Sequence, residues 1–244
     1  MNWIAAMCVG TVVLASASYA QQPGEQTHRT FRKRVVKTYT GQYLLYLPPE
    51  YGKDRSRRWP LMVFLHGAGE RGSDLEKVKT HGPPKLVAQG KVFPFILVSP
   101  QCPEGQWWDT DMLDALLDTV LSKYRVDPDR VYLTGLSMGG FATWAWAAAH
   151  PERFAAIAPI CGGGDPFLAW RLKSLPVWAF HGAKDPVVPV KMTTDMVDAL
   201  KAAGGDVRVT IYPDAGHDAW TDTYNNQELY DWFLQHHRHA DSAK

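Results

Sequence analysis

One serine stands between two glycines in the segment VYLTGLSMGGFATWAWAAAH, residues 131–150, where two patterns meet. The apolar residues before the motif are typical of a buried strand, and those from Met138 onward are typical of a helix. Gly135 and Gly139 leave room for a tight turn between them that a Cβ would obstruct. Such a turn lifts the hydroxyl above the carboxyl ends of the strands, where parallel sheets bind ligands. Ser137 is therefore a candidate nucleophile.

A serine hydroxyl is a weak nucleophile near neutral pH and needs a general base within hydrogen-bond reach. Two later segments supply partners, each after an apolar run that predicts a strand. FHGAKDPVVP contains Asp185 and YPDAGHDAW contains His217. His217 would accept the serine proton and return it to the leaving group, while Asp185 would hold the imidazole in one tautomer. Asp165 and Asp214 are the alternative acids.

Backbone N–H groups near the serine could stabilise an oxyanion. The N–H of Met138 would lie at a helix N-terminus, where such groups lack partners and the helix dipole is positive. The N–H of Ala68, in the loop FLHGAGERGSD after an earlier predicted strand, is the second candidate. Losing one donor of this kind typically costs about a hundred- to a thousand-fold in turnover. His66 and His181, each followed by glycine at a strand end, are expected to be structural.

Alternating strands and helices must position these residues. PLMVFLHG and FPFILVSP are nearly continuous apolar runs, typical of strands buried on both faces. TDMLDALLDTVLSKY and KMTTDMVDALKAAG have apolar residues at helical spacing. RVVKTYT and GQYLLYLP predict an antiparallel hairpin around Gly41. The pattern predicts an α/β fold with a mostly parallel, twisted sheet of about eight strands and helices on both faces.

Composition excludes several classes of protein. With 244 residues, 45% of them hydrophobic, the chain fits one α/β domain. Its formal charge of +1 favours neither a nucleic-acid partner nor an acidic tail. The absence of Cys-x-x-Cys and His-Glu-x-x-His motifs gives no support to a metal site. The cationic preference of a helix end explains His236, His237 and His239. Cys102 and Cys161 could pair, but their positions do not settle whether they are bridged.

The first twenty residues carry no charged side chain and end in small residues around Tyr19. This pattern is typical of a secretory signal peptide cleaved after Ala20. An uncleaved anchor is the alternative, although an apolar run of about 17 residues is short for a spanning helix. Residues 21–30 are expected to be a flexible lead-in and residues 31–240 a single domain. The expected protein is secreted or periplasmic, without stable membrane insertion after cleavage.

The order Ser137, Asp185, His217 is that of the α/β-hydrolase fold, and residues from about 40 to 237 resemble a serine esterase of that superfamily. The motifs LHGAGERG, SPQCP…WWD, GLSMGG, PICGGGD and HGAKDPVVP resemble those of compact secreted bacterial esterases. These are of the feruloyl and acetyl esterase (carbohydrate esterase family one), polyhydroxybutyrate-depolymerase-like and dienelactone-hydrolase-like kind. The resemblance implies cleavage of carboxylic esters through an acyl-enzyme on Ser137 without a cofactor.

The substrate is less determined than the chemistry. Only the fifteen residues GGGDPFLAWRLKSLP separate two predicted strands, too few for a cap domain, so an open cleft is expected. Trp107 and Trp108 lie at the catalytic end of the sheet and could stack on an aryl acyl group, with packing as the alternative. Short-chain or aryl esters, such as acetyl or feruloyl groups free or on a polysaccharide, are the expected substrates. A peptidase, a thioesterase and a non-catalytic binding protein are the alternatives, and the oligomeric state is left open.

Overall fold

The apolar runs of the sequence form the centre of a sheet. The computed structural model describes residue 26 and residues 28–238. Three predicted strands are buried along their whole length: β2 (Trp59–Leu65), β3 (Ile96–Pro100) and β6 (Val177–Gly182). The same holds for β5 (Ala156–Ile160). A strand that is apolar on both faces is stable only between two layers of other elements, so helices must cover both sides of this sheet.

Within the described residues, seven strands form this sheet in the order β1-β3-β2-β4-β5-β6-β7. The remaining strands are β1 (Tyr43–Tyr46), β4 (Val126–Leu136) and β7 (Val207–Tyr212). Every neighbouring pair is parallel except β1 with β3, which is antiparallel. The mostly parallel sheet is confirmed, with seven strands where about eight were expected.

The hairpin predicted around Gly41 is wrong. Residues 34–40 form no strand, and β1 pairs with β3, which lies more than fifty positions along the chain. Val35 and Val36 are exposed. Adjacent residues of a strand point to opposite faces. Pairing of residues 34–40 with β1 would therefore bury only one of these two valines against the core. Little apolar surface was therefore available to drive the pairing.

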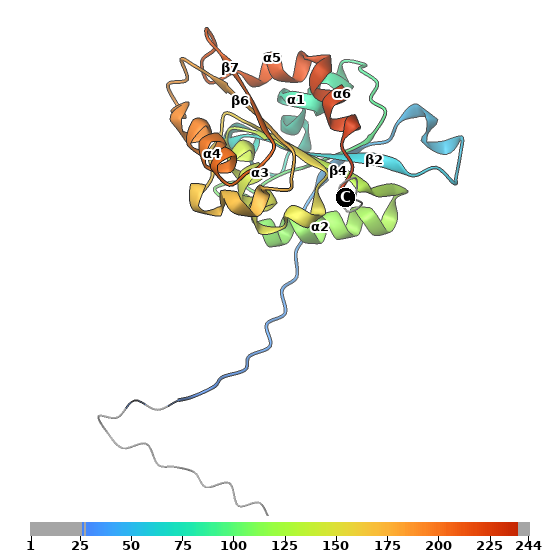
Figure 1. The fold of residues 1–244 in the computed structure, drawn as a ribbon. Helices are drawn as coiled ribbons and strands as arrows, with labels where there is room; N and C mark the ends of the chain where they lie inside the picture. The colour runs from blue at the N-terminus through green and yellow to red at the C-terminus, as the bar shows by residue number, and fades with distance from the viewer. Residues whose placement is uncertain (1–25, 27, 239–244) are drawn as a thin grey trace, which may run out of the picture. The chain divides into compact units, whose positions relative to one another are not determined.

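Six α-helices in the described residues cover the two faces of the sheet. They are α1 (Gly82–Ala88), α2 (Thr110–Lys123), α3 (Met138–Ala149), α4 (Lys191–Ala202), α5 (Trp220–Asn225) and α6 (Gln227–Gln235). Figure 1 shows α1, α5 and α6 on one side and α2, α3 and α4 on the other. Residues of β2 alternate between the two sides of the sheet. Leu61 and Val63 pack with α2, α3 and α4, whereas Met62 and Phe64 pack with α1, α5 and α6.

The connections that carry candidate site residues are short. Only the short 3₁₀ helix η5 (Pro166–Leu172) lies between β5 and β6, so no cap domain is inserted there. The other 3₁₀ segments are η1 (Pro49–Gly52), η2 (Ala68–Glu70), η3 (Leu75–Thr80) and η4 (Pro151–Arg153). Among the described residues, no helix combines the length and apolarity needed to span a bilayer.

The chain divides into two units, one ending at Thr38 and one beginning at Tyr39. Of the first unit, residues 28–38 are described in full; they are exposed and have no regular secondary structure. The predicted signal peptide, residues 1–20, and His239 lie outside the described residues.

Candidate active site

Ser137 occupies the turn between β4 and α3. Its backbone angles, φ 51° and ψ −116°, are a conformation that residues with a side chain rarely adopt. The packing around the turn is close. A Cβ on Gly135 would lie 2.4 Å from the carbonyl oxygen of Gly139, and one on Gly139 would lie 2.0 Å from that of Leu65. Both positions therefore require glycine, and the surrounding backbone holds the serine in its strained conformation.

Three side chains from three separate loops meet at this turn. Nε2 of His217 lies 2.9 Å from Oγ of Ser137, and Nδ1 lies 2.7 Å from Oδ2 of Asp185. An ionised carboxylate can only accept, so Nδ1 of His217 carries the proton and donates it to Asp185. Nε2 is then free to accept the hydroxyl proton of Ser137. The geometry is that of a nucleophile, a base and an acid that orients the base.

Asp185 accepts three hydrogen bonds and has a fourth nitrogen close by. Its Oδ1 accepts from the N–H groups of Val187 and Val188 at 2.8 and 2.9 Å. Its Oδ2 accepts from His217 and lies 3.1 Å from Nε2 of His181. Burial raises the pKa of this carboxyl, but the hydrogen bonds from His217 and from the two backbone N–H groups bring the pKa below its ordinary value. Asp185 is therefore ionised at neutral pH.

The two alternative acids lie elsewhere. The carboxylate of Asp165 accepts from the N–H of Phe167 at 3.0 Å and so caps η5. Asp214 has a side chain that is 89% exposed and pairs with Lys184 at 2.6 Å. Of the three candidate acids, only Asp185 has a hydrogen bond to His217 among the described contacts.

The two candidate oxyanion donors lie at the starts of helical turns. Met138 is the first residue of α3 and Ala68 is the first residue of η2. The N–H groups of a first turn have no acceptor within their own helix. The loop after β2 lies against the serine turn, since a Cβ on Gly139 would also be 2.8 Å from the carbonyl oxygen of His66. Both donors therefore belong to segments in contact beside Ser137.

Trp107 and Trp108 have different environments. Trp107 is 65% exposed, and its ring meets that of Phe141, in the first turn of α3, edge-on at 6.2 Å between centroids. Trp108 is 8% exposed, and its indole N–H donates to the carbonyl oxygen of His66 at 3.2 Å. Trp108 thus lies in the core beneath the loop after β2, and only Trp107 presents a large surface to a ligand.

Two residues outside the predicted site contact it. The ring of Trp220 meets that of His217 edge-on at 5.0 Å between centroids. His181, expected to be structural, lies within hydrogen-bond distance of Asp185. The spacing of His181 and Asp185, four residues apart around a glycine, was the available signal for this second contact.

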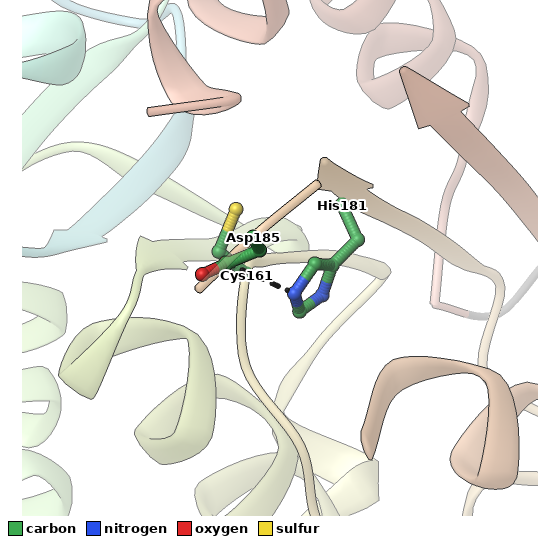
Figure 2. Close-up of side chains that lie close together, drawn as sticks. All are labelled: Cys161, His181 and Asp185. Carbon is green, nitrogen blue, oxygen red and sulfur yellow. Dashed lines mark ion pairs between the residues drawn. The ribbon is translucent and has the colours of Figure 1, made fainter. Parts of the chain in front are cut away.

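Cys161, His181 and Asp185 lie close together (Figure 2). Each offers one possible ligand atom, and these atoms lie within 4.8 Å of one another. Their other contacts do not suit a metal ion. Both ring nitrogens of His181 have partners, Thr193 Oγ1 at 2.8 Å and the Val188 carbonyl oxygen at 2.9 Å. Burial raises the pKa of the Cys161 thiol to about 12, so it stays protonated. We interpret Cys161 and His181 as buried side chains that pack around Asp185, not as metal ligands.

The two cysteines whose pairing the sequence left open are not bridged. Cys102 and Cys161 are both free and buried. Burial raises the pKa of Cys102 to about 11, so this thiol is also protonated at neutral pH. Neither thiol therefore has the ionised, exposed character of a reactive cysteine.

We expect His66 to make stability depend on pH. Burial lowers its pKa from 6.5 to about 4, with a smaller contribution from Arg71. Between these values the unfolded chain binds more protons than the folded one, so the free energy of unfolding falls as pH falls. Above pH 6.5 His66 is neutral in both states and does not change the free energy of unfolding. By pH 4 the uptake of a proton by the unfolded chain has lowered that free energy by about 3 kcal/mol.

Urea unfolding of the wild type and His66→Asn at several pH values between 7 and 4 would measure this contribution. The variant should lose less stability than the wild type over the range, because it lacks the group that takes up the proton. Equal losses in the two proteins would contradict the prediction. The comparison removes the contribution of the carboxylates, which both proteins share.

Residues 105–239, more than half of the chain, match the model of the family described as "Dienelactone hydrolase family". A protein of Aspergillus terreus named "Probable feruloyl esterase C" is 25% identical over 204 residues, which cover 79% of this chain and 72% of that protein. A bifunctional acetylxylan esterase/xylanase of Neocallimastix patriciarum is 30% identical over 137 residues, or 53% of this chain.

A solved structure extends the likeness. The crystal structure of a thermostable esterase is 35% identical, has a TM-score of 0.69 and covers 80% of this chain. The chain spans 59% of that protein and 20% of the bifunctional enzyme, so each has a large part with no counterpart here. The family match, the named relatives and this structural likeness confirm the α/β-hydrolase fold and the resemblance to esterases predicted from the motifs.

Proposed function

We propose, from the premise that the chain belongs to the dienelactone hydrolase family, that it hydrolyses carboxylic esters with Ser137 as nucleophile. The observation that carries the proposal is the line of hydrogen bonds from Ser137 through His217 to Asp185. A serine in a strained turn with an oriented imidazole at 2.9 Å has the activation that acyl transfer needs. Feruloyl and acetylxylan esterases among the relatives support the ester bond as the target.

The reaction has two halves. Oγ of Ser137 attacks the carbonyl carbon while Nε2 of His217 takes its proton, and the carbonyl oxygen becomes an oxyanion facing the N–H groups of Met138 and Ala68. The C–O bond to the alcohol breaks, and His217 donates the proton to that oxygen. Water then attacks the acyl-enzyme in the same way, giving its proton to His217, and the serine leaves as its hydroxyl. Asp185 stays ionised and stabilises the imidazolium in both halves.

Open surroundings favour small or polymer-attached esters. Ser137 is half-buried, Ala68 is exposed, and the β5–β6 connection carries only η5. We propose acetyl, other short acyl or feruloyl groups as the acid part, as a small molecule or on a polysaccharide. We also propose a single domain over residues 31–240. The apolar, uncharged first twenty residues support a secreted or periplasmic location.

A substrate panel tests the function. It contains p-nitrophenyl esters from acetate to laurate, methyl ferulate, acetylated xylan and a peptide p-nitroanilide, each with wild type and Ser137→Ala. Turnover of esters that is lost in the variant supports the proposal. Turnover of the anilide alone would instead indicate a peptidase. If no substrate is turned over and a fluorophosphonate leaves the protein unlabelled, the chain is a binding protein.

Trp107 is expected to favour aryl acyl groups. Its exposed ring stands beside the first turn of α3, and stacking of this kind contributes about 0.5–1.5 kcal/mol. Trp107→Ala should therefore lower kcat/KM for methyl ferulate by about three- to tenfold relative to p-nitrophenyl acetate. Trp170→Ala, at a tryptophan on η5 that is 60% exposed, is the matched control and should leave the ratio unchanged. An unchanged ratio in Trp107→Ala would remove this residue from the acyl site.

A further inference from the structure

The structure assigns His66 the task of orienting the peptide group between Gly67 and Ala68, and through it the second oxyanion donor. The inference rests on the proposed function and adds to it a positioning residue outside the triad. His66 is the first residue after β2, and its side chain is 1% exposed. A side chain this buried is not available to contact a substrate, so any effect on the reaction must act through the backbone beside it.

The partners of His66 determine its tautomer. The backbone N–H of Cys102 lies 3.0 Å from Nε2, and a backbone N–H can only donate. Nε2 must therefore present its lone pair, and the one proton of the neutral ring is on Nδ1. Nδ1 lies 2.6 Å from the carbonyl oxygen of Gly67 and donates to it. The carboxylate of Glu70, at 3.9 Å from Nδ1, is too distant to take this hydrogen bond.

The hydrogen bond to Gly67 fixes more than a carbonyl group. The carbonyl of Gly67 and the N–H of Ala68 belong to one planar peptide group, which is trans like every described peptide bond. In a trans peptide these two groups point in opposite directions. Holding the carbonyl toward the buried ring of His66 therefore holds the N–H of Ala68 away from it. A half-turn of this peptide would exchange the N–H for a carbonyl oxygen, which repels an oxyanion.

The ring is itself held in place. The indole N–H of Trp108 donates to the carbonyl oxygen of His66 at 3.2 Å, and the two rings pack with centroids 4.8 Å apart. The N–H of Cys102 fixes the opposite nitrogen of the ring. Both partners come from the segment after β3, so two loops lock the donor before any substrate arrives. A donor fixed in advance costs no reorganisation when the oxyanion forms.

Two variants separate the donor from the bulk of the ring. In His66→Asn the side-chain amide nitrogen can take the place of Nδ1 and donate to Gly67. In His66→Gln the longer side chain places its amide near Nε2, where it can serve Cys102 but not Gly67. For p-nitrophenyl acetate we expect His66→Gln to lower kcat about a hundredfold with KM changed less than about threefold. His66→Asn should keep kcat within about tenfold of the wild type.

A tetrahedral ligand gives an independent measurement. Phenylboronic acid forms a negatively charged tetrahedral adduct with an active serine, so its inhibition constant should rise in His66→Gln in parallel with the loss of kcat. Thermal unfolding of both variants shows whether they are folded. Equal losses of kcat in the two folded variants, or a loss confined to KM, would overturn the inference.

The tautomer can be tested without any activity. A two-bond proton–nitrogen correlation spectrum of the labelled wild-type protein shows which nitrogen of His66 carries the proton. A proton on Nδ1 supports the inference and a proton on Nε2 refutes it. A wild type that hydrolyses no ester would defeat the proposed function, while this spectrum would still decide whether the Gly67–Ala68 peptide is held as described.

Discussion

Ser137→Ala and His217→Ala are each expected to lower kcat for p-nitrophenyl acetate by about 10⁵- to 10⁶-fold, and the double variant is expected to be no slower than either. The two side chains share one hydrogen bond of 2.9 Å and act as a unit in one proton transfer. Once either is absent, the other has no step left to assist. The remaining rate should then reflect only substrate binding and the oxyanion donors.

The matched control for this series is Ser122→Ala. Ser122 lies on α2, is exposed, and its hydroxyl donates to the carbonyl oxygen of Thr119 at 2.9 Å. Its replacement should leave kcat unchanged. The measurement is the steady-state rate of the four variants, with enough protein to detect slow turnover. Losses that multiply in the double variant would show that Ser137 and His217 act independently, which contradicts a nucleophile–base pair.

Asp185→Asn is expected to lower kcat about 10⁴-fold while the protein stays folded. The hydrogen bonds decide the orientation of the new amide. Oδ1 accepts from the N–H groups of Val187 and Val188, so this position must remain an oxygen. The amide nitrogen is then forced to face Nδ1 of His217 and donates to it. His217 must carry its proton on Nε2, where it can no longer accept a proton from Ser137.

Asp214→Asn is the control for the substitution chemistry. Asp214 is one of the alternative acids, and its exposed carboxylate meets only Lys184 among the described ion pairs. This variant should keep kcat within about twofold of the wild type, as expected for a surface ion pair. A large loss at Asp214 together with a small loss at Asp185 would reverse the assignment of the acid.

Most of the candidate site could be predicted from the sequence, because each catalytic candidate follows an apolar run that forms a strand. The carboxyl ends of parallel strands meet at one edge of a sheet, so the loops that contain Ser137, Asp185 and His217 had to converge. The close glycines could be anticipated for the same reason. A Cβ at Gly139 has no space because the loop after β2 must cross there.

Other features depend on contacts that no local pattern contains. β1 pairs with β3, so its strand partner could not be inferred from the adjacent RVVKTYT run. Trp107 and Trp108 are neighbours in one loop and look equivalent in the sequence. Trp108 is buried, with its indole N–H bonded to the carbonyl oxygen of His66, 42 positions away, and its ring packed on that of His66. Trp107 has no such partner among its described contacts and is exposed. Long-range backbone partners of this kind become visible only in the folded chain.

Ser137 as the nucleophile is the central assignment, and covalent labelling tests it most directly. The purified protein would be treated with a fluorophosphonate, and the modified residue would be located by peptide mass spectrometry, with Ser137→Ala and Ser122→Ala treated in parallel. We expect one added group, at Ser137, in the wild type and in Ser122→Ala, and none in Ser137→Ala. An unmodified wild type, or a modification at any other residue, would contradict the account.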